Sequence, residues 1–190
     1  MAALSTLYPQ LVPELTQCPT PILKQALEQA SRDFCRDTSA WRADLTAIPT
    51  VADQAVYTLT SDEAEAVIHQ VLRCDVDTTE DWRYTVDRRA GTIELDPAPQ
   101  TTGDDIELEV VYQPLATVTA LPDFLMDRYQ HLLVYRVLSR LKSRRRTPWN
   151  DPDGARYYEL MYRDGVASLL ADEIIDGGSG EIVMGVTHVL

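Results

Sequence analysis

Basic side chains concentrate between positions 136 and 146, where they could bind an anion or an acidic protein surface. The cluster consists of Arg136, Arg140, Lys142, Arg144, Arg145 and Arg146. Three of the arginines follow each other at steps of four, which places them on one face of a helix. Guanidinium groups hold phosphate and carboxylate through paired hydrogen bonds. The cluster predicts a contact with phosphate or with an acidic partner. A solvated helix end is the competing interpretation, because cations also favour the C-terminal end of a helix.

The charges that follow this cluster have the opposite sign. Between Asp127 and Asp151 the sequence holds no acidic residue, whereas the segment 151–176 holds seven acids against two arginines. A basic patch and an acidic helix on one chain favour head-to-tail assembly, in which the patch of one subunit meets the opposite surface of the next. We expect the six basic residues to make inter-subunit or partner contacts.

Residues that could carry catalysis or bind a metal are scattered along the chain. The three histidines, His69, His131 and His188, have no partner at the spacing of metal ligands. The sequence contains neither a zinc-binding HExxH motif nor a phosphate-binding P-loop. The serine motif of a nucleophile elbow does not occur either. We therefore expect no enzymatic activity, no metal and no cofactor.

The composition is that of one folded domain, with 190 residues, 45% of them hydrophobic and 25% charged. Seventeen basic and 30 acidic residues give a net charge of −13, which repels DNA phosphates and anionic lipid. No apolar run approaches the roughly 20 residues that span a bilayer, and the first residues lack the pattern of a secretory signal. The odd count of three cysteines favours buried, reduced thiols. These features predict an intracellular protein that does not bind membranes.

The hydrophobic periodicity changes twice along the chain. Apolar residues recur at helical steps over about 20–40, alternate over about 43–115, and return to helical steps over 123–146 and 151–175. Closely spaced alternating segments favour antiparallel strands. The pattern predicts an α+β fold, a helical bundle of about three long helices with an inserted antiparallel β-region.

Local signals refine these elements. Thr20 and Pro21 mark the start of the first helix, and its polar residues, Asp33 among them, lie between the apolar ones of an amphipathic face. The prolines before this helix predict an extended or irregular leader. One face of the predicted strand 66–76 carries Ile68, Leu72, Cys74 and Val76.

The last segment differs from the rest in composition. A Gly/Ser-rich joint at 177–180 precedes residues of high strand propensity, namely Ile182, Val183, Met184, Val186 and Val189. An apolar tail of this kind seldom stays free in water, and added strands are a common way of binding. We predict one domain over 1–176 and an extended, flexible C-terminal docking arm over 177–190.

Several short motifs occur in a characteristic order. They are Tyr8-Pro9, Cys18-Pro19, Phe34-Cys35-Arg36-Asp37-Thr38-Ser39-Ala40-Trp41, Gly91-Thr92-Ile93-Glu94-Leu95, Val110-Val111-Tyr112-Gln113-Pro114, Leu121-Pro122-Asp123-Phe124-Leu125 and Pro148-Trp149. In this order they resemble the head-to-tail adaptor (connector) proteins of tailed bacteriophages. The resemblance covers roughly residues 8–170, and the motifs are structural.

The resemblance implies a place in the neck of a virion assembled in the host cytoplasm. Proteins of this kind form a ring, typically of twelve subunits, beneath the portal protein. The ring would extend the DNA channel and join the packaged head to the tail or to the next neck protein. Genomic DNA would pass through the lumen without sequence-specific binding. The basic cluster would pack between neighbouring subunits. The C-terminal arm would pair with a strand of the portal protein or wrap around a neighbouring subunit.

Two alternatives to this function remain open from the sequence. The chain could form a neighbouring ring, such as a tail-completion protein of the neck, because stacked rings face similar demands. It could also be a nucleic acid-binding module that uses the basic helix 136–146, although the net charge of −13 argues against this.

Overall fold

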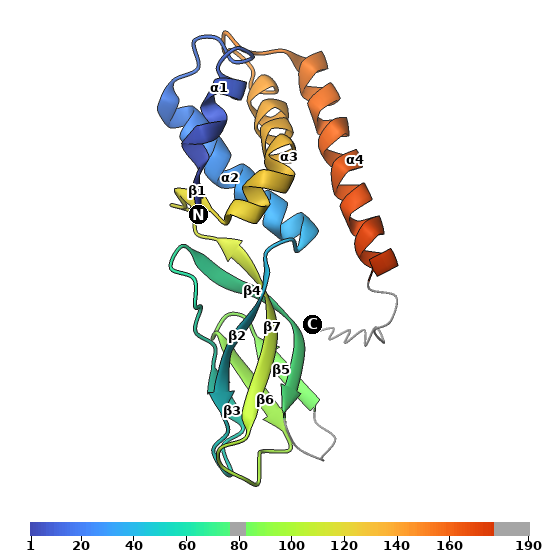
Figure 1. Cartoon of the computed structure of the whole chain (residues 1–190). Coiled ribbons are helices and arrows are strands. Elements are labelled where there is room, and N and C mark those ends of the chain that lie inside the picture. The colour runs from blue at the N-terminus through green and yellow to red at the C-terminus, as the bar shows by residue number, and fades with distance from the viewer. Residues whose placement is uncertain (77–82, 177–190) are drawn as a thin grey trace.

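The computed structural model describes residues 1–76 and 83–176, which form a mixed α+β fold as the periodicity predicts. Helices gather at one end of the molecule and most strands at the other (Figure 1). The helices are η1 (Leu4–Leu7, a 3-10 helix), α1 (Tyr8–Leu11), α2 (Thr20–Thr38), α3 (Asp123–Lys142) and α4 (Pro152–Asp176). The strands are β1 (Ala2–Ala3), β2 (Arg42–Pro49), β3 (Val56–Thr58), β4 (Ala66–Val76), β5 (Arg83–Asp87), β6 (Thr92–Asp96), β7 (Asp105–Pro114) and β8 (Ala120–Leu121).

The N-terminal leader is folded, so the helical part is not the bundle of about three long helices that the sequence predicts. The described residues contain four α-helices, of which α1 lies in the leader. Four leucines recur there at steps of three and four, and all are buried: Leu4, Leu7, Leu11 and Leu15. Pro9 is tolerated because it lies in the first turn of α1, where its missing N–H has no helical partner. The prediction of an extended or irregular leader was wrong because the prolines outweighed this leucine spacing.

Helix α3 is shorter than predicted because the chain that follows it caps its C-terminus. The helix ends at Lys142, before the predicted end at 146. The Lys142 carbonyl accepts a hydrogen bond from the Asp151 backbone N–H at 2.9 Å and another from Asn150 Nδ2 at 3.0 Å. These donors satisfy a carbonyl that would otherwise lack a partner at the helix end. Asp151 also caps α4, since its Oδ1 accepts from the Gly154 N–H at 2.9 Å.

Two three-stranded antiparallel sheets make up the β-region. One has the order β2-β7-β4, the other β3-β6-β5, and a two-stranded pair β1-β8 lies beside the helices. Strand β7 is the centre of its sheet and pairs with β2 and β4 on its two sides. Its Ile106, Leu108, Val110 and Tyr112 are buried, as their alternation predicts.

Strand β4 departs from the strict alternation assumed for it. Its register with β7 shifts between Ile68 and Gln70 and again between Val71 and Arg73. Each irregularity changes which side chains share a face. Val71 is therefore buried, while Leu72 is only half-buried and does not continue the face of Ile68. The predicted grouping of Ile68, Leu72, Cys74 and Val76 was wrong at Leu72.

Side-chain contacts join the helical end to the β-region. Trp41 follows α2 and packs on Tyr112 of β7, with ring centroids 5.7 Å apart. On the other side, the Glu65 carboxylate accepts from the Thr119 N–H at 3.0 Å, from the Thr119 hydroxyl at 2.9 Å and from the Ala120 N–H at 3.2 Å. These hydrogen bonds lower the pKa of Glu65. Strand β1 pairs with β8 directly beyond this contact, so the N-terminus also ties the two regions together.

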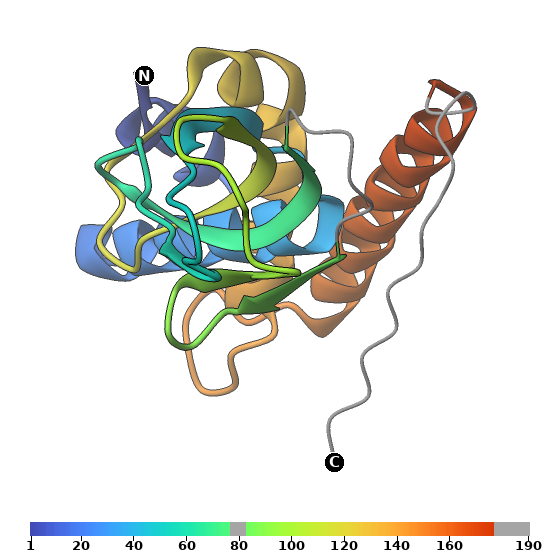
Figure 2. The same cartoon turned by 90° about the horizontal axis from the view of Figure 1, so that it is seen from below.

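Helix α4 lies beside α3 (Figure 1) and at one flank of the molecule (Figure 2). Gly165 allows α3 and α4 to approach, because a Cβ atom there would lie 2.3 Å from Cδ2 of the buried Leu132. The exposed side of α4 keeps large apolar side chains in solvent, with Tyr157 57% and Leu160 60% exposed. This exposed apolar surface makes α4 a candidate contact site.

The three cysteines are free thiols. Cys35 is buried, as expected, and Cys18 and Cys74 are half-buried. Burial raises the pKa of Cys35 to about 12 and that of Cys74 to about 11. These two thiols therefore remain protonated at neutral pH.

Candidate partner-binding site on the helical end

A buried carboxylate on α2 organises the first part of the predicted basic cluster. Asp33 is 3% exposed, and its Oδ2 accepts from Arg136 Nε and Nη2 at 3.2 Å each and from Arg140 Nη1 at 3.0 Å. Its Oδ1 accepts from Gln29 Nε2 at 3.0 Å. A carboxylate of this kind is stable in the core only because several donors compensate its lost hydration. Asp33 therefore fastens α2 to α3.

The same arginine continues the network to α4. Arg136 Nη1 donates to Glu159 Oε2 at 3.0 Å, and Ser139 Oγ donates to the same oxygen at 3.1 Å. Arg136 also lies over the ring of Tyr162, 4.9 Å from its centroid, a favourable cation–π geometry. The Tyr162 hydroxyl donates to Asp37 Oδ2 at 3.1 Å. One guanidinium thus links three helices.

Lys142 is also engaged within the chain. It is 8% exposed, and its Nζ donates to Glu14 Oε2 at 2.9 Å and to Asp151 Oδ2 at 3.3 Å. Burial by itself would lower the pKa of Lys142, but these hydrogen bonds raise it above its ordinary value. The bond from Lys142 in turn lowers the pKa of Glu14. Lys142 therefore connects the N-terminal leader, α3 and the start of α4.

The last three members of the cluster lie on the connection between α3 and α4. Arg144, Arg145 and Arg146 are all exposed, and Arg146 has a positive φ of 62°. Within the described part of the chain, no carboxylate forms an ion pair with any of these three side chains. The structure thus divides the predicted cluster into Arg136, Arg140 and Lys142, which bind internal carboxylates, and three arginines that face solvent.

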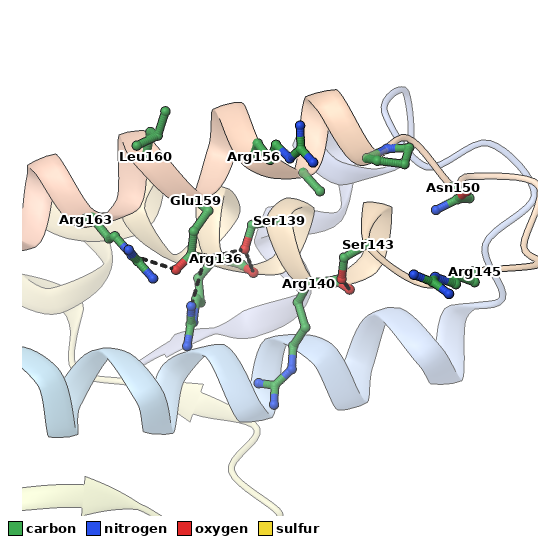
Figure 3. Close-up of a pocket in the computed structure, with 12 residues that line it drawn as sticks. Arg136, Ser139, Arg140, Ser143, Arg145, Asn150, Arg156, Glu159, Leu160 and Arg163 are labelled. Carbon is green, nitrogen blue, oxygen red and sulfur yellow. Dashed lines mark hydrogen bonds and ion pairs between the residues drawn. The ribbon is translucent and has the colours of Figure 1, made fainter.

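A hollow of about 740 Å³ opens between α3 and α4 beside this connection (Figure 3). We call it the arginine groove. Its lining consists of Arg136, Ser139, Arg140, Ser143, Arg145, Asn150, Pro152, Ala155, Arg156, Glu159, Leu160 and Arg163. Arg136 and Arg140 point from α3 toward α2, whereas Arg156 lies on α4 and Arg145 on the connection between α3 and α4 (Figure 3). Five arginines face one carboxylate, so the groove suits an anionic ligand.

Sequence reasoning missed the acidic partners of the cluster. Glu14 and Glu159 form ion pairs with the cluster from other elements. Asp33, predicted to lie among the polar residues of its helix, is buried beneath the cluster. A signal for Asp33 existed, because it follows the buried Ala30 by three residues and directly precedes the buried Phe34. For Glu14 and Glu159 the sequence offers no comparable signal.

Other predicted features either lie elsewhere or remain outside the described residues. The docking-arm residues Ile182, Val183, Met184, Val186 and Val189 belong to the undescribed segment 177–190. Among the residues that the structure describes, no three His, Cys, Asp or Glu side chains are placed to hold a metal ion together. None of the helices in those residues is long and apolar enough to span a membrane.

Comparison with known proteins places this architecture in a family. A search among curated proteins finds no match. A family model described as the SU10 adaptor protein matches residues 2–181, nearly the whole chain. The match includes both the helical end with its arginine groove and the β-region. It confirms the resemblance carried by the ordered motifs, and this chain belongs to the SU10 adaptor family of structural head–tail adaptor proteins of phages.

Proposed function

We propose that this adaptor forms a closed ring below the portal of the capsid, with twelve subunits as the family resemblance implies. The ring would extend the DNA channel and join the packaged head to the tail. The observation that carries the proposal is the family match over residues 2–181, which implies a component of the virion neck that associates with other head–tail proteins.

The distribution of charge supports a conduit for DNA. The segment 42–121, which forms most of the β-region, holds sixteen acidic and five basic residues. An acidic wall repels phosphate, so it does not grip DNA that must later leave the head. A surface of this kind would let the genome move along a lumen without sequence-specific binding.

Two parts of the chain would contact neighbouring subunits or partner proteins. Of the predicted contact residues, Arg144, Arg145 and Arg146 are the most available, because Arg136, Arg140 and Lys142 already bind internal carboxylates. The segment 177–190 would act as a docking arm beyond the domain 1–176. Its apolar residues would bind the portal protein or a neighbouring subunit by strand addition.

An electron-microscopy map of the intact neck tests the proposal. We expect a ring of this chain directly below the portal, with the β-region near the DNA path. A ring at a different level, next to the tail, would assign the chain to the alternative of a tail-completion protein. Particles without the chain at the neck would contradict both functions.

A nucleic acid-binding module with residues 136–146 is the remaining alternative. The exposed arginines of the α3–α4 connection favour it, whereas the internal ion pairs of Arg136 and Lys142 and the net charge of −13 oppose it. Binding of duplex DNA that weakens steeply with salt, and that is lost in an Arg144→Ala/Arg145→Ala/Arg146→Ala variant, would support this alternative.

A further inference from the structure

Three arginines of the arginine groove can still bind an anion, because their internal ion pairs are weak, partly exposed or absent among the described residues. Arg145 has no ion pair with any carboxylate of the described residues, and Arg156 meets only Asp153, at 3.8 Å between two exposed side chains. The side chain of Arg140 is 42% exposed although it binds Asp33. An exposed pair such as Arg156 and Asp153 contributes little and exchanges easily. These three guanidinium groups can therefore receive carboxylates from outside.

Apolar surface borders the same groove on α4. Leu160 lines it, and Tyr157, one helical turn before Leu160, is similarly exposed. The groove follows α4 from Pro152 to Arg163, about 18 Å at the rise of an α-helix. Its length and its volume suit a short peptide segment. The arginines can bind carboxylates, and the apolar side chains beside them can bind an apolar anchor residue. This combination of residues is typical of protein–protein contacts.

The observations favour a peptide over duplex DNA. A duplex meets cations spread along an open surface, whereas these arginines line a hollow between two helices and share it with Glu159. Glu159 accepts hydrogen bonds from Arg136 and Arg163 and holds them within the groove. A duplex would also bring its phosphates against the strongly acidic remainder of the chain, whereas a short peptide contacts the groove alone.

The position of the groove indicates which protein supplies the peptide. The groove reaches the helical end of the molecule, and the acidic segment 42–121 lies at the opposite end (Figure 1). In a closed ring of parallel subunits, equivalent surfaces lie at equal heights. With the long axis of the subunit along the ring axis, the acidic β-region of one copy does not reach the groove of its neighbour. The acidic helix α4 does lie at that height, but its Asp151 and Glu159 already bind Lys142 and Arg136 of their own chain. The family implies association with other head–tail proteins, so such a protein, above or below the ring, is the better source.

We infer that the arginine groove binds an acidic segment, containing an apolar anchor residue, of a different head–tail protein. Carboxylates of this segment would bind Arg140, Arg145 and Arg156, and its apolar anchor would pack against Leu160 and Tyr157. The choice of a different protein rests on the ring of the proposed function. The chemistry of the groove does not depend on the ring.

A selection experiment tests the chemistry on the full-length protein. A library of short random peptides is selected on the wild-type chain and on an Arg145→Glu/Arg156→Glu variant. The matched control is Arg88→Glu/Arg89→Glu, which makes the same charge change on two exposed arginines of the β-region. We expect wild type and control to enrich peptides that combine several carboxylates with a large apolar residue. The groove variant should bind the best of these peptides at least roughly tenfold more weakly.

Each other outcome contradicts the inference. It is wrong if no acidic peptide is enriched, or if the control variant loses peptide binding to the same extent. It is also wrong if a short DNA duplex competes with the peptide and the groove variant no longer binds that duplex. The map of the neck tests the source of the peptide. A ring whose groove is empty, or is filled by another copy of this chain, overturns the inference and leaves the proposed ring intact. A neck without the ring overturns the proposed function, while the peptide selection still reports on the groove.

Discussion

Asp33 on α2 and Arg136 on α3 are joined through a single carboxylate oxygen, because Nε and Nη2 of Arg136 both donate to Oδ2 of Asp33 at 3.2 Å. The two residues are 103 positions apart in the chain. Arg140 binds the same oxygen from the next turn of α3. This one buried carboxylate therefore binds two successive turns of α3 to α2, beside the packing of Phe34 on Tyr129.

Replacing this carboxylate should destabilise the helical end. Asp33→Asn keeps the shape of the side chain but removes the charge that compensates Arg136 and Arg140. We expect the free energy of unfolding to fall by about 2–3 kcal/mol, less than for a fully buried pair because both arginines are partly exposed. Chemical denaturation measures the effect. Asp127→Asn, on an exposed position of α3, is the control. Equal stability of the two variants would show that the Asp33 network contributes no net stability.

The contact of Lys142 with Glu14 should make stability depend on pH. Glu14 has a lowered pKa, so its contribution is complete above the ordinary value of 4.5 and is lost as the pH falls through the lowered value. Lys142 has a raised pKa, so its contribution is complete below the ordinary value of 10.5 and is lost as the pH rises through the raised value. Lys142→Met removes both contributions. The variant should therefore lose less stability than the wild type when the pH is lowered or raised.

Thermal unfolding over a range of pH measures this dependence. Lys24→Met is the matched control, because its exposed ammonium lies 3.8 Å from Glu28 in a solvated pair on α2. The control should keep the wild-type pH profile. Identical profiles for the Lys142 and Lys24 variants would mean that the contact between the leader and α3 does not respond to pH.

The close approach of α3 and α4 should depend on Gly165. In Gly165→Val, the new side chain meets Leu132, which is buried and cannot move away freely. We expect a loss of about 1–3 kcal/mol in the free energy of unfolding, because overpacking forces the helices apart. Ala167→Val adds a β-branched side chain at an exposed position of the same helix and should have a small effect. Helix propensity favours valine over glycine, so a loss of stability at position 165 reports packing. If Gly165→Val loses no more stability than Ala167→Val, packing against Leu132 does not limit the approach of the helices.

The proposed docking arm can be tested in assembled particles. Deletion of residues 177–190 should give packaged heads that lack tails or leak DNA, because the apolar residues that would bind the portal or a neighbour are missing. A full-length variant with Ile182→Asp and Val186→Asp keeps the length of the arm and should show the same defect. Negative-stain microscopy of the particles measures it. Normal tail joining in either variant would exclude the arm as the docking element.

The amino-acid sequence by itself determined the α+β class, the approximate extent of the long elements and the family resemblance. These depend on periodicity and on the order of local motifs, which the sequence records directly. The alternation in β7 predicted one face of buried residues, Ile106, Leu108, Val110 and Tyr112, but not the burial of Val111. In β4 the same reasoning failed at Leu72, because irregular pairing with β7 changes the facing of side chains and depends on the partner strand.

Only the tertiary structure decided what the basic stripe does. Steps of four predicted that Arg136 and Arg140 share a face of α3, but spacing along one helix does not say which distant element covers that face. The fold brings Asp33 and Glu159 to it, from positions far away in the chain, and leaves Arg145 in solvent. The reason is physical: the energy of a charged side chain depends on the burial and the charges around it, and packing sets both.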